Sequence, residues 1–242
     1  MRRRTASRLP ATALDAGGRS GDGVVMDASD AEILWQAACG LARTAESVSR
    51  GGRRRADAPP PLLFFTDPLR TPRPWETAAR LPAGAAVVYR HFGAADAGDA
   101  ARRLREATGR AGVRLLVGLD APLAAQVGAD GVHLPERALD EAAALAAAHP
   151  DWWITGAAHG AGGLARAGAL DAVVLSPVFP AGGASGDRPA LGLERFRTLV
   201  AGAPAPAYAL GGIDATNAHE LAGSGAYGLA GVGAIRAAFG PD

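Results

Sequence analysis

Eight short apolar runs, separated by stretches of helical spacing, constrain the fold of this chain more than any other feature. The runs are continuously apolar, which is typical of strands buried on both faces of a parallel sheet. The candidate strands are Leu62–Thr66, Ala86–Tyr89, Arg114–Leu119, Gly131–Leu134, Trp152–Gly156, Ala172–Leu175, Ala207–Leu210 and Gly228–Gly231. Helical patterns lie between them, including Asp96–Thr108, Arg137–Ala148 and Glu194–Ala201. Eight strand–helix units predict an α/β fold, a single compact (β/α)8 TIM barrel over residues 61–242.

Glycine-rich loops follow the last two candidate strands. The segments read Ala207-Tyr-Ala-Leu-Gly-Gly-Ile213 and Gly228-Leu-Ala-Gly-Val-Gly-Ala-Ile235. In a (β/α)8 barrel the loops after strands 7 and 8 often bind phosphate through backbone amides at helix N-termini. The candidate phosphate-binding residues are Gly211, Gly212, Gly231 and Gly233. Glycines also serve plain tight turns, so a turn without a ligand is the alternative.

A doubly wound open sheet is the alternative fold. Such folds carry G-x-G-x-x-G directly after the first strand. Here that position reads Thr66-Asp-Pro68, and the glycine loops come last. The order of the motifs therefore favours the barrel.

Composition excludes several classes of function. The net charge of +1 gives no overall field that would recruit nucleic acid or an acidic membrane. The single cysteine, Cys39, excludes a disulfide framework and fits a reducing, cytoplasmic location. The charged start Met1–Arg4 is followed by no apolar stretch through Gly23, so we expect neither export nor membrane insertion. The sequence contains no lysine, which rules out Schiff-base catalysis.

The N-terminal quarter differs from the barrel. Residues 1–28 lack periodicity and are expected to form a disordered leader. Residues 29–60 are expected to form an extra helix and linker, with Ser29 and Glu32 as a capping box at the helix start. Its apolar positions recur at helical spacing from Leu34 to Val48. That face could cover the bottom of the barrel, form a homodimer or dock elsewhere.

Four segments occur in an order that resembles the thiamine-phosphate synthase and TenI superfamily. They are Gly128–Leu134, Ser176–Pro180, Leu191-Gly192, and Ala209–Ile213 with Asn217, and the resemblance covers residues 61–238. Members of that family are small (β/α)8 barrels that handle the thiazole phosphate of thiamine biosynthesis. The resemblance implies one of two reactions. Synthases join the thiazole phosphate to a pyrimidine pyrophosphate with magnesium, whereas TenI-type relatives isomerise the thiazole ring.

The synthase residues are largely absent. The family's Arg-x-Lys after strand 2 becomes Arg90-His91-Phe92, which keeps only the arginine as an anion ligand. The Asn-Asp pair after strand 3 falls on Gly118-Leu119, and the metal-binding aspartate after strand 4 becomes Ala138. Asp120 is expected first as a helix N-cap, and Glu136 could be a stand-in ligand or contact substrate. The loop at 181–188 has no lysine. We therefore expect no cofactor, with magnesium required only if the chain is a synthase.

The remaining chemistry falls on histidines and a serine. His159 lies where TenI-type proteins keep a histidine proposed to move protons on the thiazole, and imidazole can both remove and return a proton near neutral pH. His133 could orient the ligand or fill a polar layer, and Ser176 could bind the ligand or cap a turn. The expected partner is a small phosphorylated heterocycle. Three hypotheses remain: a TenI-type tautomerase, a divergent thiamine-phosphate synthase, and a non-catalytic phosphometabolite-binding protein.

Overall fold

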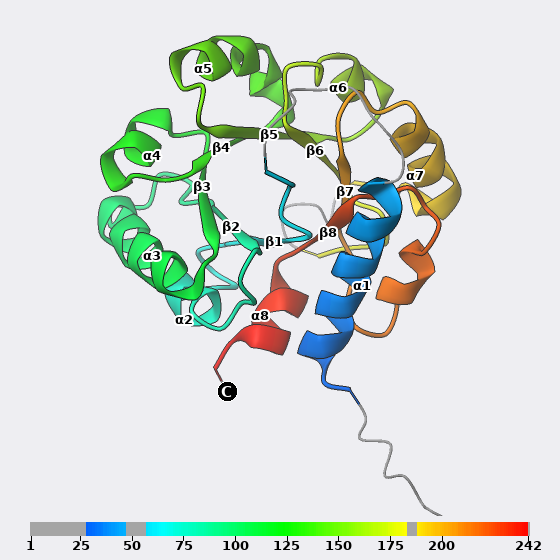
Figure 1. Cartoon of the computed structure of the whole chain (residues 1–242), viewed down its shortest axis with the longest axis horizontal. Helices are drawn as coiled ribbons and strands as arrows, with labels where there is room; N and C mark the ends of the chain where they lie inside the picture. Colours follow the sequence, from blue (N-terminus) through cyan, green and yellow to red (C-terminus); the bar gives the residue numbers. More distant parts are fainter. Residues whose placement is uncertain (1–27, 47–56, 183–187, 242) are drawn as a thin grey trace, which may run out of the picture.

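The chain folds into a closed barrel of eight parallel strands surrounded by helices (Figure 1). The computed structural model describes residues 28–46, 57–182 and 188–241. The strands are β1 Leu62–Phe65, β2 Ala86–Tyr89, β3 Arg114–Gly118, β4 Gly131–Leu134, β5 Trp153–Ala158, β6 Ala172–Leu175, β7 Ala207–Leu210 and β8 Gly228–Gly231. Each strand pairs with the next, and β8 closes the barrel on β1 through Leu63↔Ala230. The predicted (β/α)8 fold is confirmed.

Helices of very different lengths cover the outside of the barrel. They are α1 Asp30–Glu46, α2 Pro74–Ala78, α3 Ala97–Ala111, α4 Ala121–Val127, η1 Glu136–Glu141, α5 Ala142–Ala148, α6 Ala161–Ala165, α7 Gly192–Ala201, η3 Ala218–Leu221 and α8 Gly233–Phe239. The segment expected as one helix over Arg137–Ala148 divides into the 3-10 helix η1 and the α-helix α5. No helix in the described ranges is long and apolar enough to cross a membrane.

Seven of the eight strand predictions agree with the structure to within one residue at each end. The exception is β5, which continues to Ala158 although the pattern indicated an end at Gly156. Gly156 lies inside this strand, where a Cβ atom would come within 2.5 Å of Leu139 Cδ2. This glycine therefore makes room for packing instead of ending the strand.

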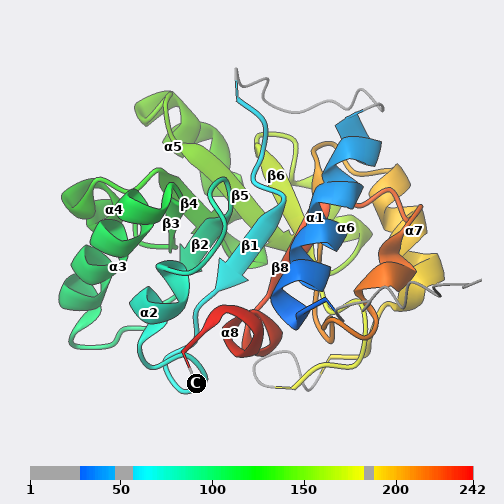
Figure 2. The ribbon, with the colours of Figure 1, turned by 60° about the horizontal axis from the view of Figure 1, so that its bottom comes forward.

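Helix α1 belongs to the outer layer of the barrel. The predicted capping box is present, because Ser29 N donates to Glu32 Oε2 at 2.9 Å and Glu32 N donates to Ser29 Oγ at 3.3 Å. Helix α1 packs on β8, β1, η3 and α8, and Figures 1 and 2 show it along the outside of β8. Only the short η3 connects β7 to β8, so α1 supplies cover that these strands need.

This packing settles where the extra helix docks. Leu34, Ala38 and Leu41 are buried in the layer between strands and helices, so the helix covers the side of the barrel and not its bottom. Residues 1–27 of the expected leader, Val48 of the expected helical face and the first part of the linker, through Ala56, lie outside the described residues.

Candidate functional site

A cavity of about 920 Å³ opens at the carboxyl ends of the strands. Active sites of (β/α)8 barrels lie at this end. Its walls come from residues at or after the ends of β1 to β7, including Phe65, Arg90, His91, Phe92, Leu119, Asp120, His133, Glu136, His159, Ser176, Arg188 and Leu210. Five of the nine predicted site residues are therefore brought together: Arg90, His133, Glu136, His159 and Ser176.

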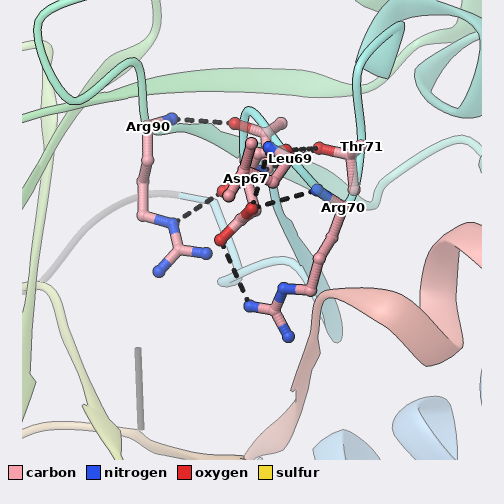
Figure 3. Close-up of polar contacts among 6 residues, drawn as sticks. Asp67, Leu69, Arg70, Thr71 and Arg90 are labelled. Atoms are coloured by element: carbon pink, nitrogen blue, oxygen red, sulfur yellow. Dashed lines mark hydrogen bonds and ion pairs between the residues drawn. The ribbon is translucent and has the colours of Figure 1, made fainter. Parts of the chain in front are cut away.

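Arg90 is fixed at the end of β2 by Thr66, the residue directly after β1. Its amide donates to Thr66 Oγ1 at 2.9 Å, and its Nε donates to Thr66 O at 2.8 Å (Figure 3). The guanidinium carbon lies 5.3 Å from the Phe65 ring centre and 5.4 Å from that of Phe92. Its Nη2 is buried without a hydrogen-bond partner among the described residues. A buried, unpaired donor on a cation is suited to an anionic ligand.

The charge of Arg90 persists at neutral pH. Burial lowers the pKa of Arg90 to about 10, an effect that the nearby Asp67 carboxylate opposes. Asp67 also orders the loop after β1, since its Oδ1 accepts hydrogen bonds from Leu69 N at 3.1 Å and Arg70 N at 3.0 Å. In Figure 3 the two arginines lie on either side of Asp67. Although burial of Asp67 would raise its pKa, these backbone donors and Arg70 hold that pKa below its usual value.

His159 is held in one orientation by contacts on both ring nitrogens. Nδ1 lies 2.8 Å from Ser176 O and 3.3 Å from Ser176 Oγ. Because a carbonyl oxygen only accepts, the hydrogen-bond partners assign the proton of the neutral ring to Nδ1. Nε2 lies 3.0 Å from Arg188 Nη1 and accepts from it. The imidazole thus presents an unprotonated nitrogen on the cavity wall, as a general base requires.

Glu136 supports the backbone of His159. Its Oε2 accepts a hydrogen bond from His159 N at 2.6 Å. The carboxylate also lies against Gly163 in α6, where an added Cβ would be 2.8 Å from Oε2. The contact gives this carboxylate a role in shaping the loop after β5. The sequence carried no local sign of this pairing, because Glu136 follows β4, whereas His159 and Gly163 follow β5.

His133 lies on the floor of the cavity and is only 6% exposed. Its Nδ1 lies 3.0 Å from Thr155 Oγ1, and that hydroxyl donates to Val132 O at 3.4 Å. Nδ1 therefore donates to Thr155, and Nε2 is left as an acceptor. Burial, and then the charge of Arg90, lower the pKa of His133 to about 3. His133 is consequently neutral at physiological pH and cannot act there as a proton donor from an imidazolium ion.

The side chains after β3 and β4 do not fit magnesium, the ion that the resemblance implies for a synthase. Asp120 caps α4 as expected, because its Oδ1 accepts from Leu123 N at 2.9 Å. Its Oδ2 lies 3.2 Å from His91 Nε2. Leu119 and Ala138 offer no oxygen ligand, and Glu136 is bound to His159. Within the described ranges no three acidic, histidine or cysteine side chains are grouped to hold a metal ion.

The two glycine loops lie side by side, because Leu210 of β7 pairs with Ala230 of β8. Gly211 and Gly212 have φ angles of +106° and +65°, and a Cβ on Gly212 would come within 2.5 Å of Pro180 O. Packing alone thus requires glycine at 212. Gly231 ends β8, where an added Cβ would lie 2.8 Å from Ile235 Cγ1. Gly233 starts α8 with open space around it, since an added Cβ would have no neighbour within 4 Å. Phosphate binding by these loops remains a prediction.

The comparisons with known proteins agree on one family. A family model described as thiamine monophosphate synthase matches residues 73–235. A putative thiamine-phosphate synthase of Geobacter sulfurreducens is 34% identical over 139 residues, which is 57% of this chain and 65% of that protein. The thiamine-phosphate synthase of Methanoculleus marisnigri is 33% identical over 139 residues, 57% of this chain and 66% of that protein. The chain thus spans slightly less than two thirds of the length of these relatives.

A solved structure supports the same fold. The thiamine phosphate pyrophosphorylase from Pyrococcus furiosus superposes with a TM-score of 0.61 at 24% identity, over 74% of this chain and 91% of that one. At this identity the likeness concerns the fold alone.

Proposed function

The chain belongs to the thiamine monophosphate synthase family, and we propose that its barrel binds a thiazole phosphate and isomerises the ring by proton transfer through His159. The observation that carries the proposal is the orientation of His159. Its Nδ1 proton is committed to Ser176 O, so Nε2 is the nitrogen left for the ligand, and it can take a proton once Arg188 Nη1 turns from it to the ligand. In the proposed step Nε2 removes a proton from one carbon of the ligand, and the resulting imidazolium returns it to another carbon.

Charge in the cavity supports an anionic substrate. Arg90 and Arg188 both line it, and guanidinium groups bind phosphate oxygens through several donors. We place the phosphate group at the loops after β7 and β8, where Gly233 N lies at the start of a helix. His133, neutral and fixed by Thr155, would form the floor beneath the ring without moving a proton.

The test follows deuterium exchange into the thiazole phosphate by NMR in D2O containing EDTA. General acid–base catalysis contributes on the order of a hundredfold to ten-thousandfold in rate. His159→Gln retains size and polarity but cannot cycle a proton, so exchange should fall at least about a hundredfold. His219→Gln is the matched control, because His219 lies exposed on η3. Native exchange in the His159 variant would refute the proposed mechanism.

The synthase reaction is the second candidate, and the names of the relatives favour it over isomerisation. Arg90 is the one charged residue of the expected diphosphate site that remains. Purified protein would be given the thiazole phosphate and the pyrimidine pyrophosphate with and without magnesium, and thiamine phosphate would be measured. Magnesium-dependent product would establish the synthase reaction. Binding of the thiazole phosphate with neither product nor exchange would establish a non-catalytic binding protein.

A further inference from the structure

Arg188 differs from its neighbour Arg166 because it pairs with a neutral side chain. It lies between β6 and α7, is exposed, and lines the 920 Å³ cavity. Its Nη1 donates to His159 Nε2 at 3.0 Å, which is its only polar contact with a described residue. Arg166, by contrast, donates to both carboxylate oxygens of Asp140, at 3.0 and 2.6 Å. Arg188 therefore lines the cavity as a cation without an ion pair to any described carboxylate.

The contact with Arg188 covers the one basic nitrogen of the His159 ring. Nδ1 carries the proton and lies 2.8 Å from Ser176 O, so Nε2 holds the lone pair that could take a proton. That lone pair already accepts a hydrogen bond from Arg188. Protonating Nε2 with Arg188 in place would also set two positive charges against each other at 3.0 Å. His159 therefore cannot act as a base until the guanidinium moves away.

A phosphate group is the kind of ligand that can move this guanidinium. Guanidinium and phosphate attract each other as opposite charges and can form two parallel hydrogen bonds, whereas a neutral imidazole offers a single lone pair. Because Arg188 is exposed, few contacts break when its side chain turns. The loop after β7, where we place the phosphate, lies next to the loop after β6, because Leu175 of β6 pairs with Ala209 of β7. A phosphate there is on the side of the cavity from which Arg188 comes.

We propose that Arg188 makes the proton-transfer step selective for phosphorylated ligands, by covering His159 Nε2 until a phosphate draws the guanidinium away. The inference rests on the proposed function, because the uncovered nitrogen is the base of that reaction. Arg188 changes only its hydrogen-bond partner and neither gains nor loses a proton. The proton passes from a ligand carbon to Nε2 and back to another carbon, and the electrons of the broken C–H bond stay in the ring. A ring without a phosphate would enter the cavity and find the base covered.

The test compares deuterium exchange into two ligands, the thiazole phosphate and the same thiazole with a hydroxyl group in place of the phosphate. Arg188→Met keeps a long side chain but has neither donor nor charge. It should raise kcat/KM for the hydroxyl ligand about tenfold, because a hydrogen bond from a charged donor no longer has to break. It should lower kcat/KM for the phosphate ligand about tenfold, because a charged contact to the phosphate is lost. Arg188→Lys retains a cationic donor and should keep the native preference for the phosphate.

Arg137→Met is the matched control, because Arg137 is an exposed arginine of the same cavity that does not contact His159. It should leave exchange into the hydroxyl ligand at the native rate. An unchanged or lower rate for that ligand in Arg188→Met, or an equal rise in Arg137→Met, would overturn the proposal.

A measurement without turnover separates this proposal from the reaction itself. Inorganic phosphate is added to the isotope-labelled native protein and to Arg188→Met in mildly alkaline buffer, where imidazole is neutral, and the Nε2 signal of His159 is followed by NMR. We expect phosphate to move the native signal towards its position in Arg188→Met, and to leave the signal of the variant in place. A native signal that does not move would refute the role of Arg188. A signal that moves, in a protein that shows no deuterium exchange, would refute only the proposed reaction.

Discussion

The two sides of the cavity differ in what they offer a ligand. On the side of β5 to β8, His159 and Ser176 are fixed by hydrogen bonds, and the glycine loops lie next to them in the closed barrel. On the side of β2 and β3, Phe92 and Leu119 face the cavity, and Asp120 is occupied by His91 and by its own helix. We propose polar binding and proton transfer on the first side. The second offers mainly apolar surface, with the Arg90 guanidinium between Phe65 and Phe92.

The largest expected effect concerns the phosphate loops. Gly233→Asp would place a carboxylate at the first residue of α8, where it stabilises the helix but repels an anion. We expect thiazole phosphate affinity to fall about a hundredfold or more, roughly 3 kcal/mol, with an unchanged melting temperature. Gly233→Ser should bind at least as well as the native protein. Calorimetry on both variants tests this, and native affinity in the aspartate variant would show that the phosphate lies elsewhere.

His133, on the cavity floor between the two sides, should make the free energy of unfolding depend on pH. His133 has a pKa of about 3 in the folded protein and roughly 6.5 when unfolded. Below pH ~6.5 the unfolded chain takes up a proton that the folded chain does not, so the free energy of unfolding falls as the pH falls towards 3. From pH 7 to 4.5 the native protein should lose roughly 2–3 kcal/mol more than His133→Gln. Urea denaturation at several pH values measures the difference, and parallel curves would contradict the burial of a neutral His133.

The support that Glu136 gives to His159 should have an intermediate effect on the exchange rate. Glu136→Ala removes the acceptor of His159 N and should lower the exchange rate about tenfold, close to 1.4 kcal/mol. Glu136→Gln keeps an oxygen acceptor and should restore most of the rate. Phosphate affinity should hardly change in either variant, which separates positioning from binding. Equal loss in both variants would instead assign a role to the carboxylate charge.

The smallest effect concerns strain on the apolar side. Leu119→Asn should stabilise the protein by about 1 kcal/mol, because Asn enters the left-handed region at lower cost. Leu69→Asn is the control, since Leu69 is exposed without a positive φ. Denaturant titration of both variants measures the change. Equal changes in the free energy of unfolding of the two variants would show that the exposure of Leu119, and not its backbone conformation, causes the effect.

The sequence predicted some of these features better than others, for physical reasons. Strands buried on both faces leave continuous apolar runs, so the barrel and most strand ends followed from the pattern. The capping box of α1 and the cap of α4 at Asp120 are local signals and were equally readable. The contact of Glu136 with His159 and Gly163 was not, because it joins the segment after β4 to the segment after β5. The positive φ angles of Phe92 and Leu119 were missed because neither residue type indicates them.

The contrast between the two sides is tested most directly by calorimetric titration of one protein sample with two ligands. The first is the thiazole phosphate in EDTA, and the second is inorganic pyrophosphate with excess magnesium. We expect saturable one-to-one binding of the thiazole phosphate, with no need for a metal ion. We expect no saturable binding of magnesium pyrophosphate and no competition with the first ligand. Tight, magnesium-dependent binding of pyrophosphate that is lost in Arg90→Gln would contradict it, and would show that the β2–β3 side still forms a diphosphate site.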